Sequence, residues 1–335
     1  MGMNKYFKYL KGLLQLSLSL ALLTFLYWVL RHKVDGLQIV SMIRSISIWS
    51  VIAALCIVWL NVLVSAERFR LAISHLVQQA PGIALLFRVN LIGFFVAYLA
   101  PVGAANDITR IGYARRRLNI PLGKAIETVI FDRLLALVGI IVTALILIPV
   151  QAFCGIEFGT WLSQLVFWVL AGAFLFILLA IGRHFHGITN KWVMTFLGSM
   201  NNFSRMFSTG RSIALHFSLG IGYCGTFGLL MWVVGIGMGI KIDLLLTIAV
   251  TPLVMLAQNL PIFYAGWGAR EAVTVISLGT IGALTADQAL ALSISTGLIL
   301  FVASLPAAAM LLWDFIAYSN AILHKNARKT NQIEG

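Results

Sequence analysis

The chain has 335 residues, of which 60% are hydrophobic and only 10% are charged. A soluble domain carries about a quarter charged residues, so this composition excludes a water-soluble globular protein. The formal net charge of +13 is spread over short loops, which is typical of the cytoplasmic loops of membrane proteins and argues against nucleic acid as a partner.

Apolar segments follow one another along the chain at lengths near the ~20 residues that cross a bilayer. By run length they cover roughly 12–30, 46–66, 84–105, 125–149, 161–182, 212–239, 243–262, 271–284 and 287–313. We expect residues 1–320 to form a single transmembrane domain, followed by a short basic cytoplasmic tail over residues 321–335. The first segment lacks a small-residue cleavage site, so we expect it to be a retained span rather than a signal peptide.

Two of these segments end in a break that is rich in Pro and Gly and is followed by an acid and an arginine. The first break reads Leu99-Ala-Pro-Val-Gly-Ala-Ala-Asn-Asp-Ile-Thr-Arg110, and the second reads Leu260-Pro-Ile-Phe-Tyr-Ala-Gly-Trp-Gly-Ala-Arg-Glu271. Charges beside a broken hydrophobic segment are costly in a membrane unless they meet a partner, a substrate or water. Two such breaks in one chain therefore indicate a transport site.

The loop charges predict which segments cross the membrane. Basic residues gather after the first break, between residues 183 and 211, and in the tail, and the positive-inside rule assigns all three places to the cytoplasm. We therefore predict an all-α polytopic membrane protein with about six full transmembrane helices and two broken or re-entrant hairpins, over 84–105 and 243–284. The hairpins would enter from opposite faces, which is a possible inverted-repeat organisation, although no sequence identity relates the halves.

Charged residues form four clusters beside or inside apolar segments, and each cluster is a candidate for substrate binding. Glu67 and Arg70 close the second segment. Because they are three residues apart, they share one face of a helix and are able to pair. The structural alternative is an interfacial cap whose arginine snorkels to the membrane surface.

Asp107 and Arg110 repeat this spacing after the first break. If a helix restarts at Asn106 or Asp107, either side chain is a good N-cap, and the free N–H groups of that helix favour an anion. Arg110 is the residue that we most readily assign to a phosphate, because the planar guanidinium matches phosphate oxygens.

Asp132 and Arg133 lie inside an otherwise apolar segment, about one helical turn after Glu127. Neighbouring helical residues point about 100° apart, so we expect these two side chains not to pair with each other. Each then needs a partner on another helix, a substrate or water. The structural alternative is an interhelical ion pair that fixes the fold.

Arg270 and Glu271 follow the second break, where two glycines allow a close approach of the backbone. The aromatic residues Tyr264 and Trp267 lie in the same break. They belong either to the aromatic belt at the membrane surface or to the lining of a pocket for a sugar or head group.

The sequence contains no catalytic or cofactor motif. It lacks a Ser/His/acid pattern, a Walker-type loop and a metal-binding His pair, and its three cysteines have no metal-ligand spacing. We expect a protein that is not an enzyme and that needs no cofactor. An intramembrane lipid-modifying enzyme stays an alternative.

Taken in order, the motifs of this chain resemble a known family. The residues that carry the resemblance are Asn90, Gly93, Pro101, Gly103, Asp107, Arg110, Asp132, Arg133, Pro261, Gly266, Gly268, Arg270 and Glu271. The family includes the transmembrane flippase domain of lysylphosphatidylglycerol synthases and is also called YbhN-like. One departure concerns the first motif, where Ala105-Asn106 precede the acid in place of the usual glycines. The acid and the arginine are kept.

The resemblance implies lipid translocation or a helper role in the assembly of cell-envelope lipids or glycans. Our first hypothesis is a flippase of the bacterial cytoplasmic membrane that moves an anionic phospholipid or a polyprenyl-phosphate-linked glycan. The proposed groove is lined by Arg110, Arg133 and Arg270 and balanced by Asp107, Asp132 and Glu271. The alternative is a scaffold that does not transport and that binds a membrane glycosyltransferase or lipid-synthesis enzyme through the basic loop at Arg115 to Arg117.

Overall fold

The computed structural model describes residues 35–99, 104–153, 210–259, 266–280, 283–314 and 316, together with Ser17, Ala21 and Thr24. All regular elements within these residues are helices, so the predicted all-α class is confirmed for the described part of the chain. Apart from Ser17, Ala21 and Thr24, the predicted span at 12–30 lies outside the described residues, as do the span at 161–182, the tail and the central residues of both breaks.

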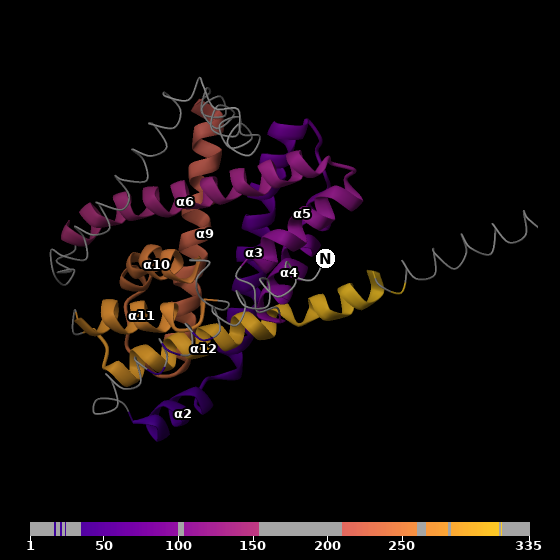
Figure 1. The fold of residues 1–335 in the computed structure, drawn as a ribbon. Coiled ribbons are helices and arrows are strands. Elements are labelled where there is room, and N and C mark those ends of the chain that lie inside the picture. Colours follow the sequence, from indigo (N-terminus) through magenta and orange to yellow (C-terminus); the bar gives the residue numbers. More distant parts are fainter. Residues whose placement is uncertain are drawn as a thin grey trace, which may run out of the picture.

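The described helices follow the predicted apolar segments in order (Figure 1). Their bounds are α2 Gly36–Arg44, α3 Ile48–Val77, α4 Ile83–Leu99, α5 Ala105–Arg117, α6 Leu122–Phe153, α9 Gly210–Gly237, α10 Leu244–Asn259, α11 Ala269–Thr280 and α12 Ala286–Ser304. Four of them provide stretches that are long and apolar enough to cross a bilayer: Ile48–Val77, Leu122–Leu147, Ala214–Gly237 and Ala286–Asp314. α4 and α10 are apolar but shorter.

Short polar signals set several helix ends. α12 begins with a capping box, in which the Thr285 hydroxyl accepts from the Gln288 amide and the Gln288 side chain accepts from the Thr285 amide. The Asp35 carboxylate accepts from the Leu37 amide at 2.9 Å and starts α2. α3 ends where Gln78 adopts a left-handed conformation, with φ of 57°.

Two sets of four helices repeat the same pattern of lengths: a long helix, two short helices and a second long helix. In the first set, α3 to α6, the helices have 30, 17, 13 and 32 residues. In the second, α9 to α12, they have 28, 16, 12 and 19 residues. In Figure 1, α3 rises where α9 descends, and α6 and α12 run in opposite horizontal directions. The predicted topology requires this opposite direction of equivalent helices.

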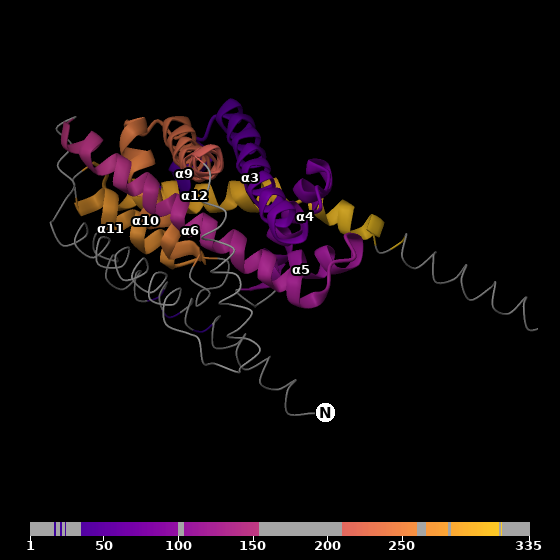
Figure 2. The ribbon, with the colours of Figure 1, turned by 90° about the horizontal axis from the view of Figure 1, so that it is seen from above.

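Each set contains one of the predicted breaks, between its two short helices. α4 ends at Leu99 and α5 begins at Ala105, and α10 ends at Asn259 and α11 begins at Ala269. In both cases the second short helix packs against the first. Figure 2 shows the two pairs at opposite ends of the molecule, with α6 and α12 each running from one pair to the other. The re-entrant path of these pairs in the membrane stays a prediction.

Small residues allow the long helices to approach closely. A Cβ atom on Gly139 of α6 would lie 2.5 Å from the Cα of Gly220 on α9, so only glycine fits at this crossing. Such contacts stabilise helix pairs in membranes, where burial from water supplies no driving force. The largest core cluster of the described residues combines buried apolar residues of α3, α4, α9, α10, α11 and α12 with Ile39 of α2 and Ile140 of α6.

The Asp314 carboxylate lies at the end of the apolar stretch Ala286–Asp314, which contains α12. It connects this stretch to the first pair of short helices, α4 and α5. Asp314 accepts a hydrogen bond from the hydroxyl of Tyr113 at 2.5 Å and forms ion pairs with Arg88 and Arg117, both at 2.8 Å. Arg88 lies on α4, and Tyr113 and Arg117 lie on α5. Both helices of the pair are therefore held to the same side chain.

The topology is testable with single cysteines at Gly36 and Gly123, in a background without the three native cysteines. Both glycines are exposed, and an added Cβ meets nothing within 4 Å at either position. We expect a membrane-impermeant maleimide added to intact cells to label Gly36→Cys but not Gly123→Cys, because the predicted topology assigns them to opposite sides. Labelling of both from outside would contradict the predicted hairpin of α4 and α5.

Candidate functional site

The charged ends of the two breaks meet at one cavity. A cavity of about 150 Å³ lies among the helices, and its wall includes Arg110 from the first break and Gly266 and Arg270 from the second. Asp132 and Arg133 also line it. A cavity of this size holds several water molecules or a small head group. Arg110 and Arg270 follow breaks that are far apart in the chain, Asp132 and Arg133 lie inside an apolar segment, and the fold brings all four together.

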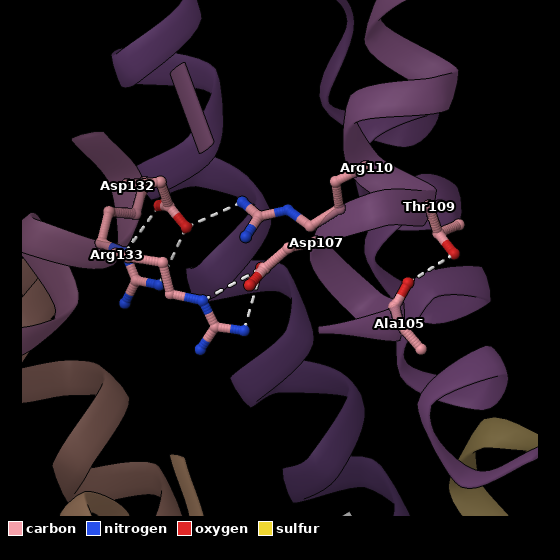
Figure 3. Close-up of polar contacts among 7 residues, drawn as sticks. Ala105, Asp107, Thr109, Arg110, Asp132 and Arg133 are labelled. Carbon is pink, nitrogen blue, oxygen red and sulfur yellow. Dashed lines mark hydrogen bonds and ion pairs between the residues drawn. The ribbon is translucent and has the colours of Figure 1, made fainter. Parts of the chain in front are cut away.

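Asp132 binds two arginines from different helices. Its carboxylate accepts from Nε of Arg68 on α3 at 2.8 Å and from Nη2 of Arg110 on α5 at 2.7 Å, as Figure 3 shows for Arg110. Arg68 also donates from Nη2 at 3.3 Å. All three side chains are buried, with exposed fractions of 0% for Asp132, 4% for Arg68 and 3% for Arg110. These residues form a buried Arg–Asp–Arg triad, which ties α3, α5 and α6 together.

Aromatic rings support both arginines of the triad. The Arg110 guanidinium lies 3.9 Å from the centroid of the Phe69 ring, and that of Arg68 lies 4.9 Å from the Tyr223 ring. A guanidinium is attracted to the face of an aromatic ring, so these contacts stabilise the two buried cations. They also hold each guanidinium in one orientation beside the cavity.

Arg133 turns away from Asp132 and pairs with Asp107 on α5 (Figure 3). Its Nε and Nη2 atoms lie 3.0 and 2.9 Å from the same oxygen of Asp107, and both side chains are partly exposed. The prediction that Asp132 and Arg133 do not pair with each other is therefore confirmed, and each forms an ion pair with another helix, which is the structural alternative that the sequence left open. The predicted N-cap at Asn106 or Asp107 is wrong, since α5 begins at Ala105 and its N-cap position is Ala104. The Asp107 carboxylate binds the cation instead of the backbone.

Arg270 and Glu271 form a second buried pair at the start of α11. Nη2 of Arg270 lies 2.6 Å from Oε1 of Glu271, and both residues are 1% exposed. Oε2 of Glu271 accepts from the amide of Gly268 at 2.6 Å, which satisfies a free N–H group at the helix start. Gly266 and Gly268 have φ of 75° and 89°, a conformation that favours glycine.

The aromatic residue Trp267 lies against this pair, with its ring centroid 4.8 Å from the Arg270 guanidinium. Trp267 therefore contacts a residue of the cavity wall rather than standing alone at the surface. Tyr264 lies outside the described residues. Gly297 on α12 packs so closely on Arg270 that an added Cβ would overlap the guanidinium.

Glu67 and Arg70 pair as predicted, with two hydrogen bonds of 2.6 and 2.8 Å between them. Neither residue lines the cavity. The predicted end of the second segment at residue 66 is wrong, because α3 continues to Val77. The physical reason is Arg68, which turns into the protein and meets Asp132, so the helix passes through this charged stretch without a break.

The charges around the cavity do not cancel. The triad, the Asp107–Arg133 pair and the Arg270–Glu271 pair together contain four arginines and three acids, which leaves one positive charge. Among the described residues, Nη1 of Arg68 and Nε of Arg110 are buried and have no hydrogen-bond partner. Buried donors with a surplus positive charge attract an anion.

Two parts of this site were missed by sequence reasoning. Sequence reasoning did not assign Arg68 to the site, although Asp132 was expected to need a partner. The amides Asn61 and Gln258 also line the cavity, and Asn90 was noted only for the family resemblance. A polar side chain in the middle of an apolar segment is the signal that identifies such residues.

Comparison with known protein families shows to which family the chain belongs. A family model of the lysylphosphatidylglycerol synthase transmembrane region matches residues 14–308. The chain belongs to this family. The match spans every residue that lines the cavity, and it confirms the resemblance inferred from the motifs. No curated protein matches the chain at a significant level.

As a member of the lysylphosphatidylglycerol synthase transmembrane family with four long apolar helices, the chain is an integral membrane protein involved in lipid biology. Within the described part of the chain, no group of three or more His, Cys, Asp or Glu residues is placed to hold a metal ion. Arginines, acids and amides provide the charged and polar groups of the site.

The triad predicts a strong effect of Asp132→Asn on stability. Removal of the charge leaves two buried guanidiniums without a counter-ion, and we expect a loss of about 3–5 kcal/mol in the free energy of unfolding. The matched control is Asp107→Asn, whose partly exposed pair is worth less than about 1 kcal/mol. Unfolding of the purified protein by SDS in mixed micelles measures both. Equal losses in the two variants would contradict the triad.

Proposed function

We propose that the chain is a lipid flippase, which moves a phosphate-bearing lipid across the membrane with the head group in the cavity between the two breaks. The observation that carries the proposal is the surplus positive charge of a buried cavity whose wall combines both breaks. A charged head group does not cross hydrocarbon unaided, whereas the acyl or prenyl chain never has to leave it. A polar cavity inside the membrane removes this barrier.

The donors at the cavity favour phosphate. Guanidinium groups match phosphate oxygens with planar, charge-assisted hydrogen bonds, and Arg68 and Arg110 keep donors that no described residue uses. The first turns of α5 and α11 contribute the partial positive charge of their N-termini. The substrate classes that fit are a phospholipid and a polyprenyl-phosphate-linked glycan, since both carry phosphate.

We place the protein in the bacterial cytoplasmic membrane, with both termini in the cytoplasm, as the basic loops predict. The sequence contains no nucleotide-binding motif. We therefore infer that an ion gradient, the membrane potential or consumption of the transported lipid supplies the driving force. The scaffold hypothesis differs in its key residues, which are the exposed Arg115 and Arg116 of α5 and their neighbour Arg117.

Arg110→Ala tests the cavity directly. Asp132 keeps Arg68 as its partner in this variant, so we expect the protein to fold while translocation of fluorescent phospholipid in proteoliposomes falls at least about tenfold, as expected for a lost charge-assisted hydrogen bond. Arg70→Ala is the control, since it removes an arginine of α3 that does not line the cavity.

Wild-type translocation in the Arg110→Ala protein would contradict the proposal. The scaffold hypothesis predicts instead that neutralising Arg115 and Arg116 impairs the cell and that Arg110→Ala does not. The two hypotheses are thus separated by the same set of variants.

Gly297→Ala provides a test that leaves every charge in place. The added methyl group overlaps the guanidinium of Arg270, which is the flexible end of its side chain, so we expect Arg270 to shift while the helix keeps its position. Translocation falls several-fold, in line with the loss of about one hydrogen bond to the head group. Gly279→Ala on α11 is the matched control, because its Cβ meets nothing within 4 Å. Equal rates in both variants would contradict a role for Arg270.

A further inference from the structure

Side-chain amides line the cavity from four different helices. They are Asn61 on α3, Asn90 on α4, Asn106 on α5 and Gln258 on α10. An amide offers both a donor and an acceptor, in contrast to the arginines, which only donate. Amides therefore add a second kind of recognition to the cavity, and the charge of a phosphate does not require it.

Asn90 has unused hydrogen-bonding capacity on both sides of its amide. The residue is 6% exposed, and neither Oδ1 nor Nδ2 has a partner among the described residues. Exchange of the two atoms by rotation of the amide leaves this result unchanged. Buried polar groups in native proteins are nearly always paired, so an unpaired amide at a cavity wall indicates a missing ligand or water.

A second amide, that of Asn61, presents its oxygen atom. Asn61 donates from Nδ2 to the backbone oxygen of Tyr223 at 2.8 Å and to the hydroxyl of Thr226 at 2.7 Å, which uses both of its donors. Its remaining capacity is therefore that of an acceptor. Oδ1 of Asn106 is also buried without a partner among the described residues, but it packs against Gly93 of α4 rather than facing a ligand. The amide oxygens of Asn61 and Asn90 are therefore the ones available to donors of a ligand.

The surplus positive charge of the cavity determines which hydrogen-bond donor of a ligand is able to bind beside the amide oxygens. Hydroxyl and ammonium groups both donate to an amide oxygen, but an ammonium group would enter a cavity lined by four arginines, Arg68, Arg110, Arg133 and Arg270. Like charges repel strongly where water is scarce. A quaternary ammonium group also has no proton to donate. The combination of amide oxygens and net positive charge favours neutral hydroxyl groups next to a phosphate.

We propose that the cavity selects a phosphate ester of a polyol or sugar and discriminates against amine-bearing head groups, with Asn90 as a specificity-determining residue. The arginines hold the phosphate, and the amides of Asn61 and Asn90 accept from the hydroxyl groups. This inference rests on the proposed function for its phosphate, and it narrows the substrate class to hydroxylated head groups.

Binding is measured first, apart from transport. The detergent-solubilised full-length protein is titrated with dihexanoyl-phosphatidylglycerol, dihexanoyl-phosphatidylethanolamine and a short-chain polyprenyl-phosphoryl-hexose by calorimetry. We expect phosphatidylglycerol or the prenyl sugar to bind at least about fivefold more tightly than phosphatidylethanolamine, as expected for one added hydrogen bond. Whichever of these two lipids binds more tightly shows whether the hydroxylated head group belongs to a phospholipid or to a polyprenyl-phosphate sugar.

Asn90→Leu removes the amide at similar volume, and Asn90→Ala is the second variant if the first does not fold. We expect either one to lower the binding ratio several-fold through weaker binding of the hydroxylated lipid, while the arginines, which are unchanged, maintain the remaining preference. An unchanged ratio in the variant, or equal binding of all lipids by the wild type, would overturn this inference. Translocation without preference in proteoliposomes would overturn it too and leave the flippase proposal standing. Selective binding without translocation would uphold it and overturn the flippase proposal.

Discussion

The ion triad around Asp132 is the constraint on which the rest of the site depends. A carboxylate with no exposed surface needs compensation, and Arg68 and Arg110 supply it from two other helices. One arginine is enough for neutrality. The second therefore places an additional positive charge inside the protein, and the Phe69 ring holds it in place. The interaction that fixes three helices also creates the electrostatic character of the cavity.

The repeated pattern of helix lengths explains why two distant breaks meet. Each set of four helices contributes one short pair, and α6 and α12 run between the pairs in opposite directions (Figures 1 and 2). The cavity lies where the inner ends of these pairs face one another, so both halves supply an arginine to its wall. Neither half contains a complete site, and a head group bound there would contact both.

Sequence reasoning could identify the breaks, the all-α class and most of the charged residues, because charge and proline are conspicuous in apolar segments. It could also predict that Asp132 and Arg133 point apart, since helical geometry alone decides this. Sequence reasoning could not identify the residues with which Asp132 and Arg133 pair. Arg68 and Asp132 lie 64 residues apart, and only the packing of α3 against α6 brings them together. The N-cap of α5 was misplaced because the helix begins at Ala105, before both Asn106 and Asp107, and the Asp107 carboxylate pairs with Arg133.

The contacts of Asp314 concentrate the attachment of the first short pair, α4 and α5, at one side chain. Arg88, Tyr113 and Arg117 all bind this single carboxylate, and they come from both helices of the first short pair. A movement of the pair away from α12 has to break these contacts together, since no other acidic residue of the described chain is paired with them. A partial separation of α4 and α5 from the apolar stretch Ala286–Asp314 would lose the contacts with Asp314 without forming new ones. The junction therefore holds both helices of the pair to the end of this apolar stretch through one shared side chain.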